Sequence, residues 1–414
     1  MFEDIVGYNY VKDLFSKTYD MYEKKEMLEG KGIDLPKSIL LYGEIHHGKS
    51  YMANIFSEAM NGLGYEKILL SLEEKIDEED VKVIEDSFTG KPTSLFIEGF
   101  KNSAIPETLT SVLLDYQQVN PDYFIIGVSD ETDFDDEEDW PYAGLFDMKM
   151  RVDEVSYIDT NMIITKFLEQ INARNIAIDD VSAMIQKCRS YKMIMRVLND
   201  AYIKAHSKGV ELSNDIIVES FNYYEYQNDD RDGIYRTDED IIETAIHEAG
   251  HAVVHFILGD NVAYVSMIKN GRSNGVEGVT YKFKDEDNLQ NTIIGALAGM
   301  AAVEIKFHRN ASGISGDITQ AVHCARRLIC FNAYYGFRLL DVDPGDKLIL
   351  SDSQRQAIVR LLEEKYDQAK ELLIKYDKLV DYVSGELLSK GYVFRSELLM
   401  MKNKIEKSYK KNIR

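Results

Sequence analysis

Two histidines and a glutamate lie within five residues in the middle of the chain. Segment 247–251 reads HEAGH, which places His247 and His251 four residues apart. Residues with this spacing share one face of an α-helix, so both imidazoles would point the same way. The spacing is typical of two ligands of one zinc ion, and Glu248 is placed to act on water rather than on the metal. The pattern predicts a peptidase with one zinc ion per chain and with Glu248 as its catalytic base.

A third protein ligand must come from another part of the chain. His255 continues the spacing of the two histidines. It would lie ~12 Å along the helix axis from His247, which zinc–nitrogen bonds of ~2.1 Å do not span, so we expect it on the helix face. An acid further along is the natural candidate, and composition does not choose between Glu304 and Asp317.

A second motif lies near the amino end. The segment from Gly43 to Ser50 matches G-x-x-x-x-G-K-[ST]. In such a loop the backbone N–H groups and Lys49 hold phosphates, and the Ser50 hydroxyl reaches magnesium. The motif predicts binding of ATP or ADP with Mg²⁺, and the candidate nucleotide-binding residues are Gly43, His46, His47, Gly48, Lys49, Ser50, Tyr51 and Glu98.

The elements around this loop indicate an α/β domain. Short apolar runs alternate with helical patterns over the first 150 residues or so, which is typical of a parallel sheet. The expected strands are Ser38–Tyr42, Lys67–Leu72, Ser94–Ile97 and Tyr123–Val128, and the expected helices are Tyr51–Asn61, Glu78–Asp86 and Glu107–Val119. The loop then follows a strand and precedes a helix, as the motif requires.

The rest of the chain has a mainly helical pattern, apart from a strand-like segment at Gly278–Phe283. Thr237 and Asp240 form a capping-box start for the helix of the two histidines, and Gly259 is its expected end. We therefore predict four parts. They are an α/β nucleotide-binding domain (1–152), a small helical lid (153–226), a polar linker (227–236) and a mainly α-helical zinc peptidase domain (237–414).

Charge and composition restrict the partners. A net charge of −23 over 414 residues disfavours nucleic acid, whose binding proteins need basic surfaces. The run Asp130–Asp139 carries eight acids in ten residues, which we interpret as a solvated loop. Three cysteines without a CxxC pair, no signal-like segment and no apolar run of ~20 residues predict a cytoplasmic chain without a membrane segment.

Together the two motifs resemble the FtsH family of AAA zinc metalloproteases. Phe2–Gly7 is similar to the family's opening segment beside the adenine site, Pro36–Lys49 to its phosphate loop and His247–Val253 to its zinc helix. Ser312–Ile318 is similar to the segment that carries the family's third zinc ligand, and Ala321, Ala325 and Arg326 match after it. The resemblance implies that Asp317 is the third ligand and that Glu304 has a supporting or structural role.

The resemblance also implies an assembly. It predicts a homo-oligomer, a hexameric ring, that feeds polypeptides to sequestered zinc sites. The strand near Gly278–Phe283 would resemble the edge that pairs with the substrate backbone.

Several positions depart from the family in the nucleotide domain. The acidic pair that ends the third core strand is Glu98–Gly99 here, the two arginine fingers fall on Leu145 and Met148, and the asparagine after the fourth strand is Asp130. Loss of such an arginine typically costs on the order of 10³-fold in phosphoryl transfer. These departures predict weak or lost ATP hydrolysis.

The elements that pull on substrate are also reduced. Between Leu72 and Ser94 there is room for one helix, whereas the family has two and an aromatic pore loop. Phe88–Gly90 is similar to that pore motif but lies too close to the next strand. The family's membrane segments ahead of the ATPase domain are missing from this sequence.

Three hypotheses follow. The first is a zinc endopeptidase that cleaves unfolded or flexible polypeptides and hydrolyses ATP weakly or not at all. The second is a fully ATP-dependent protease in which Arg151 and Glu98 replace the missing groups. The third is a nucleotide-responsive scaffold with a structural zinc ion. Structural sites usually have four protein ligands, and only His247, His251 and Asp317 are available here, which weighs against the third.

Overall fold

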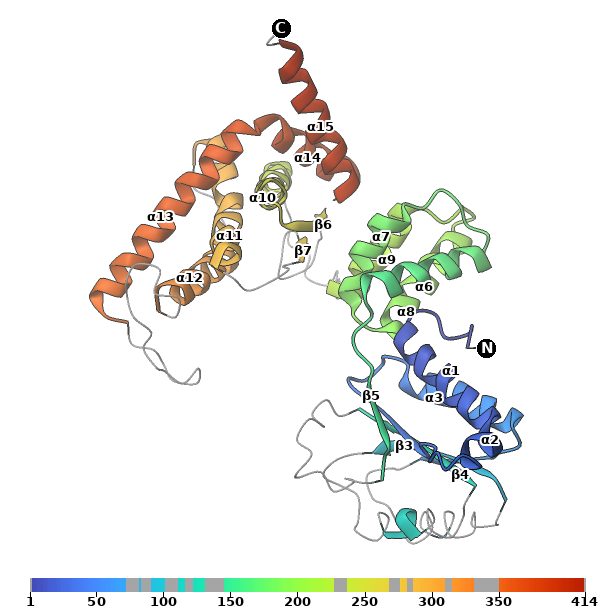
Figure 1. Ribbon diagram of the computed structural model, residues 1–414. Coiled ribbons are helices and arrows are strands. Elements are labelled where there is room, and N and C mark those ends of the chain that lie inside the picture. Colours follow the sequence, from blue (N-terminus) through green and yellow to red (C-terminus); the bar gives the residue numbers. More distant parts are fainter. Residues whose placement is uncertain are drawn as a thin grey trace. The chain divides into compact units, whose positions relative to one another are not determined.

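A computed structural model gives the fold (Figure 1). It describes residues 2–71, 82, 91–100, 111–115, 122–130, 145–226, 237–267, 276–280, 286–309, 315–330 and 350–412. The chain forms two compact units. Unit 1 comprises Met1–Arg174 and Cys188–Asp200, and unit 2 comprises Asn175–Lys187 and Ala201–Arg414.

Unit 1 is built on a five-stranded sheet with the order β2-β3-β4-β1-β5. All neighbouring strands in it are parallel. The strands are β1 (Ser38–Tyr42), β2 (Glu66–Ser71), β3 (Thr93–Phe100), β4 (Tyr123–Ser129) and β5 (Met148–Arg151). Every residue of β4 is buried, as expected for a central strand covered on both faces.

Helices α1 (Asn9–Glu23) and α3 (Lys49–Gly62) pack together, and α3 lies along the sheet (Figure 1). Four aromatic rings join this layer to the strands: Phe56 lies 4.5 Å from Phe15, 5.4 Å from Phe124 and 6.0 Å from Phe2, between ring centroids. The opening segment is thereby fixed against the helix that follows the phosphate loop. Unit 1 also contains α2 (Lys25–Glu29), α6 (Tyr157–Gln170) and the first part of α8 (Tyr191–Ser207).

The parallel sheet predicted from the sequence is confirmed. The first predicted strand has the bounds of β1, and the other three agree with β2, β3 and β4 within three residues at each end. The sequence analysis did not anticipate β5. Of the predicted helix Glu107–Val119, residues 111–115 are helical, whereas nearly all of Glu78–Asp86 lies outside the described residues.

Unit 2 is mainly helical, as predicted. Its long helices α10 (Asp238–Leu258), α11 (Glu286–Phe307), α12 (Ser315–Cys330), α13 (Asp352–Lys375) and α14 (Asp377–Lys390) pack around α10 and α11 (Figure 1). The remaining elements are α7 (Ile178–Ile185), the 3₁₀ helix Gln186–Cys188 at the boundary between the units, α9 (Asn214–Tyr226) and α15 (Arg395–Asn412).

A small antiparallel sheet accompanies these helices. It has the order β7-β6-β8, formed by β6 (Asn261–Ser266), β7 (Val276–Thr280) and β8 (Tyr392–Phe394). The predicted strand Gly278–Phe283 therefore overlaps β7, an edge strand of this sheet, and residues 281–283 lie outside the described residues. The predicted linker 227–236 lies outside them as well, and the predicted four-part division of the chain stays a prediction.

Helix α10 begins and ends where the sequence predicts. The Thr237 hydroxyl accepts a hydrogen bond from the Asp240 N–H, and the Asp240 carboxylate accepts one from the Thr237 N–H, which completes a capping box. Gly259 ends the helix with a φ of 90°, in the left-handed region that favours glycine.

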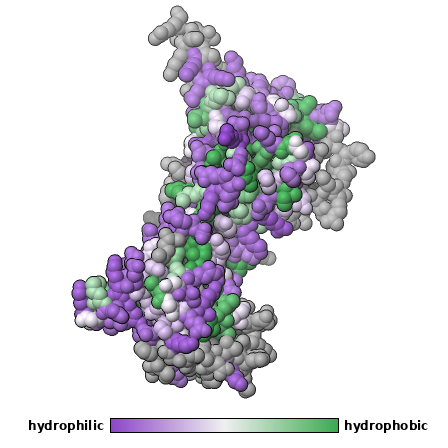
Figure 2. Space-filling model, turned by 90° about the vertical axis from the view of Figure 1, so that its right-hand side faces the viewer, coloured by the Kyte–Doolittle hydropathy of each residue, from purple (hydrophilic) through white to green (hydrophobic). Residues whose placement is uncertain are grey.

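On the surface, hydrophilic side chains are interspersed with apolar ones over the face shown in Figure 2. Among the described residues, no helix combines the length and the apolar character that crossing a bilayer would need.

Helices α10 and α11 approach each other closely because small residues line their contact. Ala249, Ala252, Ala298 and Ala302 are buried there. A Cβ atom built on Gly250 would lie 2.7 Å from both the Ala298 carbonyl oxygen and the Ala302 Cβ. The helix pair therefore has no room for even a methyl group at this position.

We expect Gly250→Ala to lower the free energy of unfolding by about 1–3 kcal/mol, because the added methyl forces two packed backbones apart. Gly385→Ala is the matched control, since Gly385 is exposed on α14 with open space around its Cβ position. That variant should be neutral or stabilised by up to about 1 kcal/mol. Denaturant unfolding measures both, and equal stability of the two variants would contradict the close-contact account.

Candidate metal centre and phosphate loop

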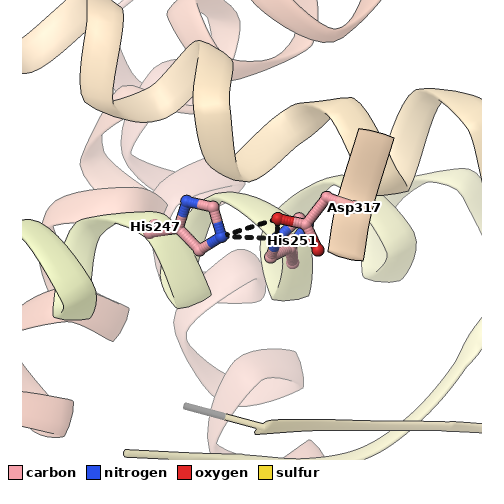
Figure 3. Close-up of side chains that lie close together, drawn as sticks. All are labelled: His247, His251 and Asp317. Atoms are coloured by element: carbon pink, nitrogen blue, oxygen red, sulfur yellow. Dashed lines mark hydrogen bonds and ion pairs between the residues drawn. The ribbon is translucent and has the colours of Figure 1, made fainter. Parts of the chain in front are cut away.

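Three side chains converge in unit 2 (Figure 3). His247 and His251 come from α10, and Asp317 comes from the first turn of α12, 70 residues after His247. His247 Nε2 lies 3.0 Å from Asp317 Oδ2 and 3.0 Å from His251 Nε2, and His251 Nε2 lies 3.5 Å from Asp317 Oδ2. Among the described residues, this is the one group of three potential metal ligands that close together.

The three donor atoms fit a zinc ion. Bonds of ~2.1 Å in a tetrahedron give edges of ~3.4 Å, close to the separations found here. The His251 Nδ1–H donates to the Gly295 carbonyl oxygen at 2.7 Å, and because a carbonyl only accepts, Nε2 of this ring keeps its lone pair. A carboxylate oxygen and an unprotonated imidazole nitrogen that face the same point suit a cation between them.

The carboxyl groups at this site differ in their electrostatics. Burial by itself would raise the pKa of Asp317, but the adjacent imidazoles of His247 and His251 outweigh it and hold the pKa well below its usual range. Burial raises the pKa of Glu248, and the nearby histidines only partly offset this effect. Asp317 is therefore ionised, as a ligand must be, while Glu248 is desolvated and more basic than an ordinary glutamate.

Two glycines of α11 make room for the histidine rings. A Cβ on Gly299 would lie 2.5 Å from His251 Nε2 and 2.6 Å from His247 Cε1. A Cβ on Gly295 would lie 2.0 Å from Nε2 of His255. The sequence analysis missed this role. The sequence pattern that could have indicated this role is the pair Gly295 and Gly299, four residues apart in an alanine-rich helix. Such a pattern lets helices pack closely.

The two other acid and histidine candidates lie apart from this group. His255 is buried rather than on an open helix face, and its Nδ1 lies 2.7 Å from Asp260 Oδ2. Glu304 accepts a hydrogen bond from Lys370 at 2.7 Å and another from the Tyr366 hydroxyl, which ties α11 to α13. Glu304 thus holds two helices together, in agreement with the structural role that the resemblance implies.

The phosphate loop in unit 1 joins β1 to α3. Gly43 has a φ of 133°, and a Cβ there would lie 2.6 Å from the Val152 carbonyl oxygen, so only glycine fits. Gly48 caps α3 with a φ of 88°. His46 is exposed with a φ of 71°, a conformation that side chains rarely adopt, whereas His47 is buried with its Nδ1 3.3 Å from the Val152 oxygen. The loop leads directly into a helix N-terminus, the arrangement that binds phosphate.

A pocket adjoins this loop. It is lined by Asp4, Ile5, Val6, Tyr8, His47, Gly48, Tyr51, Met52 and Tyr191. The opening segment and the phosphate loop therefore line one pocket. The Tyr8 hydroxyl is buried and has no hydrogen-bond partner among the described residues. It could therefore form a hydrogen bond with a polar group of a bound ligand. Ser50 is exposed at the start of α3.

The structure shows where the residues of the nucleotide domain that depart from the FtsH pattern lie. Leu145 is buried in the core under the sheet, and Met148 begins β5. Arg151, at the end of β5, pairs with Asp153 at 3.2 Å. Glu98 is half-buried near the end of β3, opposite Val128 of β4.

Sequence comparison relates the chain to known peptidases. Residues 235–338 match Peptidase family M41. The chain is 24% identical to the ATP-dependent zinc metalloprotease FtsH 2 of Thermoanaerobacter sp. (strain X514), over 96% of this chain and 82% of that protein. It is 22% identical to the ATP-dependent zinc metalloprotease FtsH 2 of Salinibacter ruber (strain M8), over 97% of this chain and 65% of that protein. The chain thus spans part of the length of these relatives.

The chain is also similar to a solved structure. The RuvB Holliday junction branch migration motor of Thermotoga maritima has a TM-score of 0.43 at 20% identity, over 62% of this chain and 83% of that chain.

We expect Gly299→Ala to weaken zinc binding at least about tenfold, because the methyl would force the rings of His247 and His251 out of place. Gly316→Ala is the matched control, one residue from Asp317 but with nothing within 4 Å of its Cβ position. Zinc competition with a chelator measures both affinities, and circular dichroism checks the fold. Unchanged zinc affinity in Gly299→Ala would show that the ring positions do not depend on this glycine.

Proposed function

Because the chain is a relative of the FtsH family of AAA zinc metalloproteases, we propose that it is a zinc endopeptidase of unfolded or flexible polypeptides. The observation that carries the proposal is the convergence of His247, His251 and Asp317 beside the buried Glu248. These three side chains would hold one zinc ion. The fourth position of a tetrahedral site then stays open, which distinguishes a catalytic from a structural centre.

In this proposal each residue has a separate task. When bound, zinc supplies the Lewis acidity that polarises a peptide carbonyl and acidifies water. Glu248 takes the proton from the attacking water and delivers it to the leaving amine. Burial favours this task, because a desolvated carboxylate holds a proton more readily than an exposed one. The Gly295 carbonyl keeps the His251 ring in the tautomer that presents Nε2.

We further propose that the nucleotide domain binds ATP or ADP with Mg²⁺ and hydrolyses ATP weakly or not at all. Leu145 and Met148 carry no charge, and Arg151, the arginine nearest to them in sequence, is paired with Asp153. Gly99 has no side chain to polarise water next to Glu98. Transition-state charge is therefore left without the arginine that usually stabilises it.

The intact loop between β1 and α3 favours the alternative of an ATP-dependent protease, because nucleotide binding is its first requirement. The hexameric ring, the polypeptide partners and the cytoplasmic location remain predictions.

Glu248→Gln tests the proposed reaction directly. We expect the variant to keep its zinc and to lose casein cleavage by about 10²–10⁴-fold, since glutamine fills the same space but cannot accept the proton. Zinc analysis and cleavage of fluorescent casein measure the two properties on the same preparation.

Glu243→Gln is the matched control. Glu243 is also buried on α10 but pairs with Arg309 at 2.7 Å, so its replacement should leave cleavage largely intact. Persistent cleavage by Glu248→Gln would refute the assigned base. Running the assay with and without ATP distinguishes a peptidase that hydrolyses ATP weakly or not at all from an ATP-dependent protease. Cleavage that depends on ATP hydrolysis would favour the ATP-dependent protease.

A further inference from the structure

The ammonium group of Lys49 is already fully engaged within the chain. Its Nζ lies 2.9 Å from the Gly43 carbonyl oxygen, 2.5 Å from that of Glu44 and 2.8 Å from Asp130 Oδ1. The Lys49 side chain is only 2% exposed. An ammonium has three N–H donors, so these partners satisfy it without a phosphate. A phosphate that binds Lys49 must displace at least one of them.

The fold explains why Asp130 reaches this lysine. Asp130 follows the carboxyl end of β4, and the phosphate loop follows the carboxyl end of β1. The two strands are parallel neighbours, so both ends meet at one edge of the sheet. The Asp130 carboxylate therefore pairs with the Lys49 ammonium, the group that binds the outer phosphates of a nucleotide in a phosphate loop.

We propose that Asp130 is a resident anion that competes with the terminal phosphate of a nucleoside triphosphate for Lys49, so that the site selects nucleoside diphosphates. A triphosphate brings one more negatively charged group next to the carboxylate than a diphosphate does. Both anions would then share a single buried cation, and like charges at such short range repel. This inference rests on the proposed nucleotide binding and is independent of the zinc chemistry.

The expected size of the effect is moderate. The Asp130 side chain is 63% exposed, so water screens its charge, whereas the lysine that it pairs with is buried. A diphosphate is held mainly by the backbone N–H groups of the loop and by the N-terminus of α3, which the carboxylate leaves free. Asp130 should therefore penalise the triphosphate far more than the diphosphate.

Asp130→Asn tests the proposal in the full-length chain, because asparagine keeps the shape of the side chain and removes its charge. Titration calorimetry with MgATP and with MgADP gives the dissociation constants. We expect ATP to bind at least about tenfold more tightly than to the wild type, and ADP to gain less than about threefold. Asp130→Ala is a second variant for which we expect the same direction.

Asp122→Asn is the matched control, because Asp122 lies at the opposite, amino end of β4 and pairs with Lys25. The substitution removes the same charge from the same unit, eight residues from Asp130 along β4, or ~26 Å. Both nucleotide affinities should stay at their wild-type values. An equal gain in ATP affinity in this control would attribute the effect to the overall charge and overturn the proposal.

An unchanged ratio of ATP to ADP affinity in Asp130→Asn would also overturn it. So would weaker ATP binding, which would identify Asp130 as a ligand that supports the Mg²⁺-bound triphosphate. Absence of ADP and ATP binding in wild type and variant alike would contradict both this inference and the proposed nucleotide binding. Casein cleavage by the same preparation tests the zinc peptidase separately.

Discussion

The close packing of α10 against α11 is the constraint on which the candidate zinc site depends. The His247 and His251 rings lie over Gly299, where a methyl group would come within 2.7 Å of both. One turn earlier, the Gly295 carbonyl accepts the His251 Nδ1–H, and its missing side chain leaves room for His255. The same helix thus provides both the space for the rings and the hydrogen bond that orients one of them. Asp317 then has only to approach from α12 to complete a set of three donors.

The two units differ in how ready their motifs are for a ligand. In unit 2 the donor atoms of three residues face a common point at separations that suit a tetrahedral metal ion. In unit 1 the loop backbone has the form that cradles phosphate, but its lysine is held by two carbonyl oxygens and a carboxylate. A binding site for phosphate is not the same as a site for its transfer, and the proposal of weak or lost ATP hydrolysis rests on this distinction.

Much of this arrangement could be predicted from the sequence, because it depends on local patterns. The caps of α10 at Thr237 and Gly259 follow from residue types at fixed spacing, and so do the strand and helix around the phosphate loop. Spacing alone left the third ligand open between Glu304 and Asp317, since Asp317 is 70 residues from His247 and only the packing of α12 brings it near. The resemblance to a known family supplied the choice.

Other features depend on tertiary contacts that no local pattern reveals. The pairing of Lys49 with Asp130 requires β4 to lie next to β1. The local sequences of the two strands do not determine their order in the sheet. A glycine within a helix can have several structural roles. The role of Gly299 follows only from its contact with the rings of His247 and His251. His255 was expected on a helix face but is buried against Asp260, because α11 covers that side of α10.

Anomalous diffraction at the zinc edge, from crystals of the purified protein, tests the central claim most directly. The account predicts one zinc ion per chain, bound by His247 Nε2, His251 Nε2 and an Asp317 carboxylate oxygen, with the remaining position open to solvent. A zinc ion held by other residues, or closed off by a fourth protein ligand, would contradict the account.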